Sequence, residues 1–371
     1  MTQLADTLRS GITAGDAVIR IHATLETGAG NAKVLPPTYV GGKHNMTAAR
    51  TDGSSAWCSL DSPASVANRI EAAIRQGYPD LAPLRVEIGQ RTLSTLDMPH
   101  RAFDAILRES RYNGIPWSET EISRALSAAT PANAYALLRH DPGVLLFGGW
   151  DSTKLGQPTN AAKQLKLPAA LSCEITATDV LPLKRAKSRI DPLGIEGTEA
   201  CLVEQADGLL EPYDEEIHGE LPIRPEKDTQ QYPRRIKPSH ANLGNVAPDL
   251  LDKGVLVRGE MRLDGIIDLR RLARYGFAPA DDVEAHLLLA LMGLYGIDAL
   301  LRRGLDLRRD CELIATQVDI SLEPYLADSI PLDLNGIAEA LSDQIDILRD
   351  HIAEPIHLEA NAALKRLEGL D

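Results

Sequence analysis

The sequence predicts an α+β fold, on two observations. Strand-like and helix-like segments are mixed along the 371 residues, and the strands are not separated by regular helices as in a doubly wound sheet. Hydrophobic residues make up 44% of the chain but aromatic residues only 4%, so the core must be mainly aliphatic. The length allows one large domain with insertions or two domains; we expect a single domain over 1–371 with insertions.

The strands of the main sheet are expected in four segments. Residues 17–27 read AVIRIHATLET, where hydrophobic side chains recur at every second position as in a half-buried strand. His22, on this strand, is interpreted as a structural residue. The other segments are 144–181, which should contain strands at 144–147 and 170–181, then 254–268 and 312–318.

Two insertions follow the first strand. Residues 31–60 should form a hairpin insertion, because Asp52–Gly53 between strand-like runs is a strong turn signal. Residues 61–140 should be helical, starting where Ser62 and Pro63 suit an N-cap and a first turn. A later helix, Pro99–Ser110, would hold Arg101 and Arg108 in surface ion pairs.

The C-terminal third should contain two helical stretches, 281–304 and 334–367, the second kinked at Pro355. The most apolar run, His286–Leu301, is shorter than the ~20 residues of a membrane span, so we interpret it as a buried helix. The N-terminus lacks a signal-peptide pattern, and the four scattered cysteines suggest neither disulfides nor zinc. A cytoplasmic protein without membrane contact fits best.

Charge is distributed very unevenly along the chain. Residues 152–190 carry seven basic side chains and two acidic ones, whereas the whole chain has a net charge of −14. An acidic protein that gathers its cations in one segment is expected to present them to an anion, and RNA is the first candidate. The alternative is an ordinary solvated basic surface.

The next segment, 191–246, is expected to be a long, largely irregular loop insertion. Residues 191–223 contain ten acids and no Lys or Arg, and residues 224–237 contain five cations and two acids. Such a long loop is either functional or disordered. Its two oppositely charged blocks could also fold against each other.

Familiar catalytic motifs are absent from the sequence. There is no phosphate-binding GxxxxGK[ST], no GxGxxG after a strand, no HExxH and no GxSxG. The histidines are scattered rather than paired at metal-ligand spacing. The residues therefore give no positive case for an enzyme, a metal site or a cofactor.

Five segments in order resemble one family. They are KVLPPTY with the hairpin and SPASVANRIEAAI after it, FGGWDST, SRIDPLGI, KPSHANLGN and LDLRRDCEL. Together they resemble the backbone subunit of the type I-G (formerly subtype U) CRISPR Cascade complex, in the Cas-seven branch of the repeat-associated mysterious proteins.

This resemblance implies an RNA-recognition-motif-like, ferredoxin-like palm enlarged by insertions, without catalytic activity. It also implies partners: CRISPR RNA, further copies of the chain along it, target DNA through the guide, and the large and Cas-five/Cas-six-like Cascade subunits. Related subunits carry a protruding thumb that kinks the RNA. Our candidate is the Glu196–Arg235 insertion, within 191–246, and the runner-up is the His44–Leu60 hairpin.

Sequence-tolerant RNA binding needs cations for phosphates, hydroxyl groups and stacking side chains. We expect two loops to face one groove. The first comprises Trp150, Ser152, Thr153, Lys154, Lys163, Lys166, Arg185, Lys187, Ser188 and Arg189, and the second Lys237, Ser239, His240 and Asn242; Lys33 and His44 are added from the KVLPPTY loop.

Several of these assignments have an alternative. Trp150 is better suited to the core than to stacking, and His240 is as well suited to a loop hydrogen bond as to RNA contact. A metal-dependent ribonuclease on the same scaffold would need an acid in the loop after the first strand, but residues 28–50 contain none. Asp52 lies in the hairpin turn, where it has a structural reason to occur. A third possibility is an acidic cytosolic enzyme of unknown chemistry.

Overall fold

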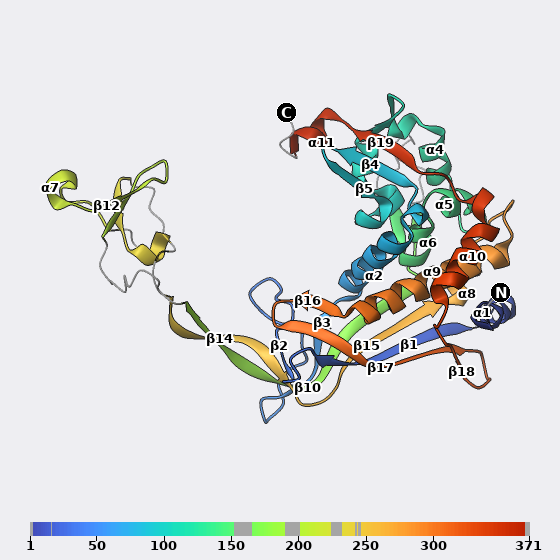
Figure 1. Cartoon of the computed structure of the whole chain (residues 1–371), viewed down its shortest axis with the longest axis horizontal. Helices are drawn as coiled ribbons and strands as arrows, with labels where there is room; N and C mark the ends of the chain where they lie inside the picture. Colours follow the sequence, from blue (N-terminus) through green and yellow to red (C-terminus); the bar gives the residue numbers. More distant parts are fainter. Residues whose placement is uncertain are drawn as a thin grey trace. The chain divides into compact units, whose positions relative to one another are not determined.

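The protein is mixed α/β with several sheets, and its chain divides into two compact units. The computed structural model describes residues 3–15, 17–151, 165–189, 201–223, 232–241, 243 and 246–367. Unit 1 comprises Met1–Leu181 and Val255–Asp371, and unit 2 comprises Pro182–Gly254. The chain leaves unit 1 along β10 (Leu171–Arg189) and returns along β14 (Val246–Val257) (Figure 1).

The main sheet of unit 1 is built around β1. Its strand order is β16-β17-β1-β15-β10-β14-β2, with β18 beside β17 and β3 beside β10. The pairings of β1 with β15 and β17, and of β10 with β15, are antiparallel. The bounds are β1 Val18–Thr27, β2 Lys33–Val34, β3 Ser55–Asp61, β15 Met261–Asp268, β16 Leu305–Arg308, β17 Cys311–Glu323 and β18 Ile330–Pro331.

One face of this sheet carries the helices and the core. Side chains of β1 are buried at alternate positions, Ile19, Ile21 and Ala23 among them, as the sequence pattern predicts. The helices α1 (Gln3–Ala14), α2 (Pro63–Gly77), α8 (Leu269–Leu272) and α9 (Asp282–Arg303) lie on this side (Figure 1). Ser62 caps α2 as expected, since its hydroxyl accepts from the amide of Ser65 at 3.3 Å.

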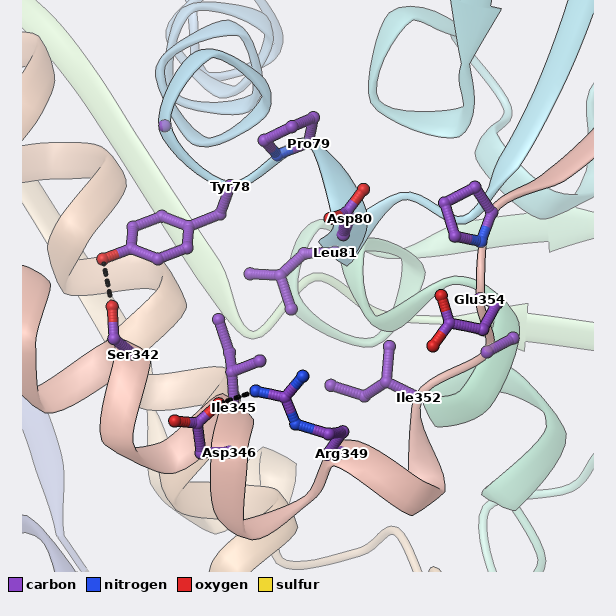
Figure 2. A pocket seen from close by; sticks show the side chains of 13 residues that line it. Tyr78, Pro79, Asp80, Leu81, Ser342, Ile345, Asp346, Arg349, Ile352 and Glu354 are labelled. Atoms are coloured by element: carbon purple, nitrogen blue, oxygen red, sulfur yellow. Dashed lines mark hydrogen bonds and ion pairs between the residues drawn. The ribbon is translucent and has the colours of Figure 1, made fainter.

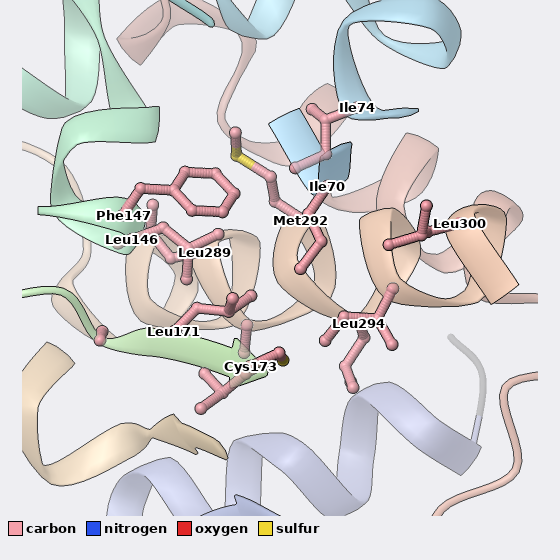
Figure 3. Close-up of a cluster of buried hydrophobic side chains, with 14 of the residues drawn as sticks. Ile70, Ile74, Leu146, Phe147, Leu171, Cys173, Leu289, Met292, Leu294 and Leu300 are labelled. Carbon is pink, nitrogen blue, oxygen red and sulfur yellow. The ribbon is translucent and has the colours of Figure 1, made fainter. Parts of the chain in front are cut away.

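Helix α9 is the centre of the core. Figure 3 shows Leu289 and Met292 of α9 among side chains from α2, Phe147 and β10. Among the described residues, α9 alone has the length and apolarity of a membrane span, but 72% of its most apolar window is buried inside the protein. Burial in the core agrees with the prediction for this run. At Gly296 a Cβ atom would lie 2.6 Å from Ile70, so glycine sets the close approach of α2 and α9.

A second sheet was not predicted from the sequence. Its order is β5-β4-β19-β6-β7, and β19 runs parallel to β4. The strands are β4 Leu84–Ile88, β5 Arg91–Ser94, β6 Ser110–Tyr112, β7 Ile115–Pro116 and β19 Ile356–Ala360. Residues 61–140 are therefore not only helical, and residues 334–367 divide into α10 (Ile337–Ile347), β19 and α11 (Ala362–Leu367). Pairing between segments far apart in sequence decides these strands.

Residues 144–147, expected as a strand, end the helix α6 (Pro142–Phe147) instead. A short apolar run is ambiguous between buried helix and strand, and Pro142 suits a helix start. The other helices of this region are α3 (Ala105–Arg108), α4 (Glu121–Ser127) and α5 (Tyr135–His140). The strand after α6 is β8 (Gly149–Asp151), which pairs with β9 (Leu165–Leu167).

The described part of unit 2 is more regular than predicted. It holds a three-stranded sheet of order β12-β11-β13, with β11 at Leu202–Glu204, β12 at Leu210–Pro212 and β13 at Arg234–Ile236, and the short helix α7 (Glu215–His218). Strand β13 of the basic block pairs with β11 of the acidic block. Arg234 Nε lies 2.8 Å from Glu204 Oε2, so the two charge blocks do fold against each other.

Candidate nucleic-acid interface

Trp150 lies on the surface rather than in the core. It sits on β8 opposite Lys166 of β9, and the Lys166 ammonium lies 5.5 Å from the centre of its ring. The side chain is 45% exposed, which leaves the ring partly open for stacking on a base. We call the β8–β9 pair the Trp150 hairpin. The predicted neighbours Ser152, Thr153, Lys154 and Lys163 lie outside the described residues.

The two glycines of FGGWD explain how this hairpin leaves the core. Phe147 is buried, and Gly148 follows it with φ = +84°. A Cβ atom there would lie 2.8 Å from the carbonyl oxygen of Leu167. At Gly149 a Cβ atom would lie 2.4 Å from Val144. A side chain at Gly149 would push the hairpin away from α6, and one at Gly148 would collide with the backbone at Leu167 and Ala169.

Arg101 holds the same turn from below, and the sequence-based prediction for it was wrong. It is not on a helix surface but in a 3-10 turn with φ = +51°, and its side chain is only 10% exposed. Its guanidinium donates to Glu71 Oε1 at 2.6 Å and to the Gly148 carbonyl at 3.0 Å. It also lies 5.3 Å from the centre of the Phe147 ring. Helix α2 is thereby connected to the base of the Trp150 hairpin.

Two buried acids surround Arg101. Burial raises the pKa of Glu71 to about 7, although the adjacent Arg101 opposes the rise. Burial also raises the pKa of Asp141 to about 6, and this carboxylate accepts from the amide of Ala102 at 2.7 Å. Because unpaired buried charges are strongly unfavourable, the arginine between these acids is central to the local stability.

The KVLPPTY loop is attached to the segment LDLRRDCEL. The amide of Leu35 donates to the Asp310 carbonyl at 2.8 Å, and Arg308 donates to the Leu35 carbonyl at 3.3 Å. Arg308 also pairs with the buried Asp61 at 3.2 Å, and Asp61 pairs with Arg69 of α2 at 2.9 Å. Two of the segments that carry the family resemblance therefore meet at Arg308, which also pairs with the buried Asp61.

Of the two predicted loop residues, Lys33 is exposed at the start of β2. His44 is half-buried, and its Nδ1 lies 3.0 Å from the Pro37 carbonyl oxygen, within hydrogen-bonding distance. Lys33 is thus open to a phosphate, whereas His44 at least partly stabilises the loop.

The later members of the first predicted group belong to unit 2. Arg185, Lys187, Ser188 and Arg189 lie on β10, which continues to Arg189 instead of ending at 181. The expectation of a loop here is wrong, because β10 continues beside β14 and this pairing extends the strand.

The remaining predicted residues follow β13. Lys237 and His240 are exposed, Ser239 lies in the 3-10 turn Pro238–Ala241, and Asn242 lies outside the described residues. The two predicted loops are therefore divided between the units, with Trp150 and Lys166 in unit 1 and the other described members in unit 2.

The helix-free face of the main sheet carries an acidic row, beside which Arg262 pairs with Asp264 at 2.7 Å. Asp319, His22, Asp264 and Glu174 lie in one row across β17, β1, β15 and β10. His22 Nδ1 lies 2.8 Å from Asp264, in keeping with the structural role expected for it. This row carries no aromatic side chain, and its carboxylates would repel phosphates, so it is unsuited to the base stacking that RNA-recognition motifs perform on their sheets.

Asp52 is fully engaged in its turn. Its carboxylate accepts from the amide and the hydroxyl of Ser54 at 3.0 and 2.6 Å, and Arg258 lies 3.3 Å away. These hydrogen bonds, those of Ser54 first, lower the pKa of Asp52 to about 2. In the described part of the chain no group of three His, Cys, Asp or Glu side chains is placed to hold a metal ion.

A separate cavity of about 290 Å³ lies between the end of α2 and α10 (Figure 2). Leu81, Ile345 and Ile352 give it an apolar lining, and the ion pair of Asp346 with Arg349 lies beside them. Tyr78 donates to the Ala338 carbonyl at 2.6 Å. None of the residues predicted to bind RNA lines this cavity.

Comparison with known protein families gives one match. The family model described as "CRISPR-associated protein GSU0053" matches residues 19–182, a region that includes β1, α2, the KVLPPTY loop and the Trp150 hairpin. No curated protein matches the chain. The family match supports a CRISPR-associated protein with a role in CRISPR defence.

Proposed function

We propose that the protein is the CRISPR RNA-binding backbone subunit of a type I-G Cascade complex. Several copies would assemble along the guide RNA in the cytoplasm and present its spacer for pairing with target DNA. The observation that carries the proposal is the match of a CRISPR-associated family over 19–182. The protein would have no catalytic activity of its own, and pairing with the guide would read the target. Its other partners would be the large and the Cas-five/Cas-six-like subunits.

The order of the central strands supports a ferredoxin-like palm. Along the chain, the strands β1, β10, β15 and β17 are first to fourth, and their order across the sheet is fourth-first-third-second. Helix α2 lies between the first and second of these strands, and α9 between the third and fourth. A strand–helix–strand unit repeated in this order is the split βαβ arrangement of RNA-recognition motifs. Unit 2, inserted between the second and third strands, is our candidate for the thumb.

The RNA would not lie on the sheet face as it does in ordinary RNA-recognition motifs. The acidic row around His22 and the exposed Trp150 hairpin argue for binding elsewhere. We assign phosphate contacts to Lys33 and Lys166 in unit 1, and to Lys187, Arg189 and Lys237 in unit 2. Such contacts are insensitive to sequence, which suits a subunit that must hold any spacer.

The proposal is tested by the binding of labelled single-stranded RNAs of unrelated sequence to the purified protein, over a range of salt concentrations. We expect similar affinities for all sequences and a steep fall of affinity with salt, because counterions are released from phosphates. Duplex DNA of equal length is the control and should bind more weakly. Failure to bind RNA at low salt, alone or with the partner subunits, would remove the proposed function.

A further inference from the structure

A tight turn in the KVLPPTY loop presents two hydrophobic side chains to solvent. Tyr39 is 44% exposed and Val40 is fully exposed. The amide of Tyr39 donates to the Lys43 carbonyl at 2.9 Å, and the amide of Gly42 donates to the Tyr39 carbonyl at 3.0 Å. Gly41 and Gly42 both have positive φ, which lets the chain reverse here. We call residues 38–43 the Tyr39 turn; its shape is fixed by its own backbone.

The residues that precede the Tyr39 turn are also fixed by hydrogen bonds and by two prolines. His44 Nδ1 lies 3.0 Å from the Pro37 carbonyl, and the adjacent proline pair, Pro36–Pro37, restricts the backbone. One residue further back, Leu35 is bound to Arg308 and Asp310. A side chain on such a support loses little further conformational entropy when it binds a ligand.

The surroundings of the turn are basic and contain no acid in the loop itself. Lys33 precedes the turn by five residues and Lys43 closes it, and both side chains are exposed. Residues 28–50 contain no Asp or Glu, although the whole chain has a net charge of −14. An exposed aromatic ring with an exposed lysine on each side of it in the sequence is a combination that suits single-stranded nucleic acid, through base stacking and phosphate contacts.

We propose that the Tyr39 turn is a stacking site for an unpaired base of single-stranded RNA. Tyr39 supplies the ring, Val40 packs against the sugar or the base edge, and Lys33 and Lys43 contact the flanking phosphates. The site rests on the proposed function, since it takes the guide RNA as its ligand. It adds a sequence-independent contact in unit 1 at a distinct loop from the Trp150 hairpin.

The test uses the full chain and a short fluorescent polyuridine RNA. We expect Tyr39→Ala to weaken binding about tenfold, because the stacking of one base is lost, and we expect Tyr39→Phe to bind like the original protein. The matched control is Tyr325→Ala, which removes a tyrosine that is 71% exposed beside the exposed Leu326 but has no lysine within six residues. That control should leave the affinity unchanged.

A second readout separates stacking from general attraction. A 2-aminopurine base in the RNA should lose fluorescence on binding and regain it in Tyr39→Ala, whereas Lys43→Gln should chiefly reduce the salt dependence. If Tyr39→Ala binds RNA as well as the original protein and quenches the base equally, the stacking site is refuted while the proposed function stands. If the original protein binds single-stranded DNA but not RNA, with the same dependence on Tyr39, the ligand assignment and the proposed function both fail.

Discussion

Replacing Arg101 by Met should destabilise the protein strongly. The substitution keeps much of the aliphatic volume but removes the hydrogen bonds to Glu71 at 2.6 Å and to the Gly148 carbonyl at 3.0 Å, together with the contact on Phe147. The side chain of Glu71 is 3% exposed, so its charge would lose its partner without gaining water. Breaking such a buried pair costs about 3–5 kcal/mol.

The loss should depend on pH, with a sign that the pKa of Glu71 fixes. Its folded pKa of about 7 lies above the ordinary value of 4.5, so the folded protein binds this proton more tightly than the unfolded chain. The free energy of unfolding therefore falls as pH rises from about 4.5 to about 7, because the unfolded chain loses this proton first. Without Arg101 the pKa of Glu71 rises further. The folded variant therefore keeps Glu71 protonated to a higher pH, and ionising Glu71 costs it more free energy than it costs the original protein. We expect the loss to be smallest and constant below about pH 6, where Glu71 keeps its proton in both folded proteins, and to increase as pH rises above about 7, where only the original protein ionises Glu71 beside Arg101.

Urea unfolding of both proteins at several pH values measures this difference directly. Arg9→Met is the matched control, because it removes the partner of Glu284 on α9, a carboxylate whose pKa is lowered by its hydrogen bond from Arg9. The Arg9→Met variant should lose stability to the same extent at every pH above about 5. Its loss should therefore not change with pH in the range where the loss of Arg101→Met does. A loss for Arg101→Met that does not change with pH would refute the reasoning about Glu71.

Three further predictions concern packing and RNA contact. Gly296→Ala should lower the free energy of unfolding by about 1–3 kcal/mol, measured by urea titration, since its Cβ would lie 2.6 Å from Ile70; an unchanged midpoint would contradict the close helix packing. Trp150→Ala should leave stability nearly unchanged but weaken RNA binding by about 1–3 kcal/mol; the reverse result would return this ring to the core. Lys187→Glu with Arg189→Glu should weaken binding to all RNA sequences and flatten its salt dependence, and an unaltered salt slope would place the phosphate contacts elsewhere.

Sequence patterns predicted those helices and strands that are determined by residues close together in the chain. The alternation of 17–27 predicted β1, the apolar run 286–301 predicted α9, and Ser62–Pro63 predicted the start of α2. These features are determined within one or two turns of chain, by side-chain periodicity and by capping.

Long-range pairing explains most of what the sequence did not reveal. Strand β19 pairs with β4, more than 250 residues earlier in the chain, and no short pattern distinguishes it from the end of a helix after Pro355. Arg101 was predicted to be a surface cation because its partners, Glu71 and the Gly148 carbonyl, are distant in the sequence, and no residue next to Arg101 indicates them. The sequence offered Trp150 both as a stacking residue and as a core residue, and its exposure depends on contacts distant in the chain, since the two glycines before it meet Leu167 and Val144.

The site residues that the sequence missed have one signal in common. Tyr39, Val40 and Lys43 lie within the acid-free stretch 28–50 of a strongly acidic chain. The lack of acids in that stretch argues against a nuclease site there. The same absence also identifies a surface on which a polyanion can lie.

The measurement that tests the central claim most directly is the nucleic-acid content of the protein purified from cells that express a matching CRISPR array, with and without the neighbouring Cascade genes. The account predicts that array-derived RNA co-purifies with the protein and is protected from nuclease in regular steps, one for each copy of the chain. Protein that is free of array RNA even with its partner subunits present would contradict it.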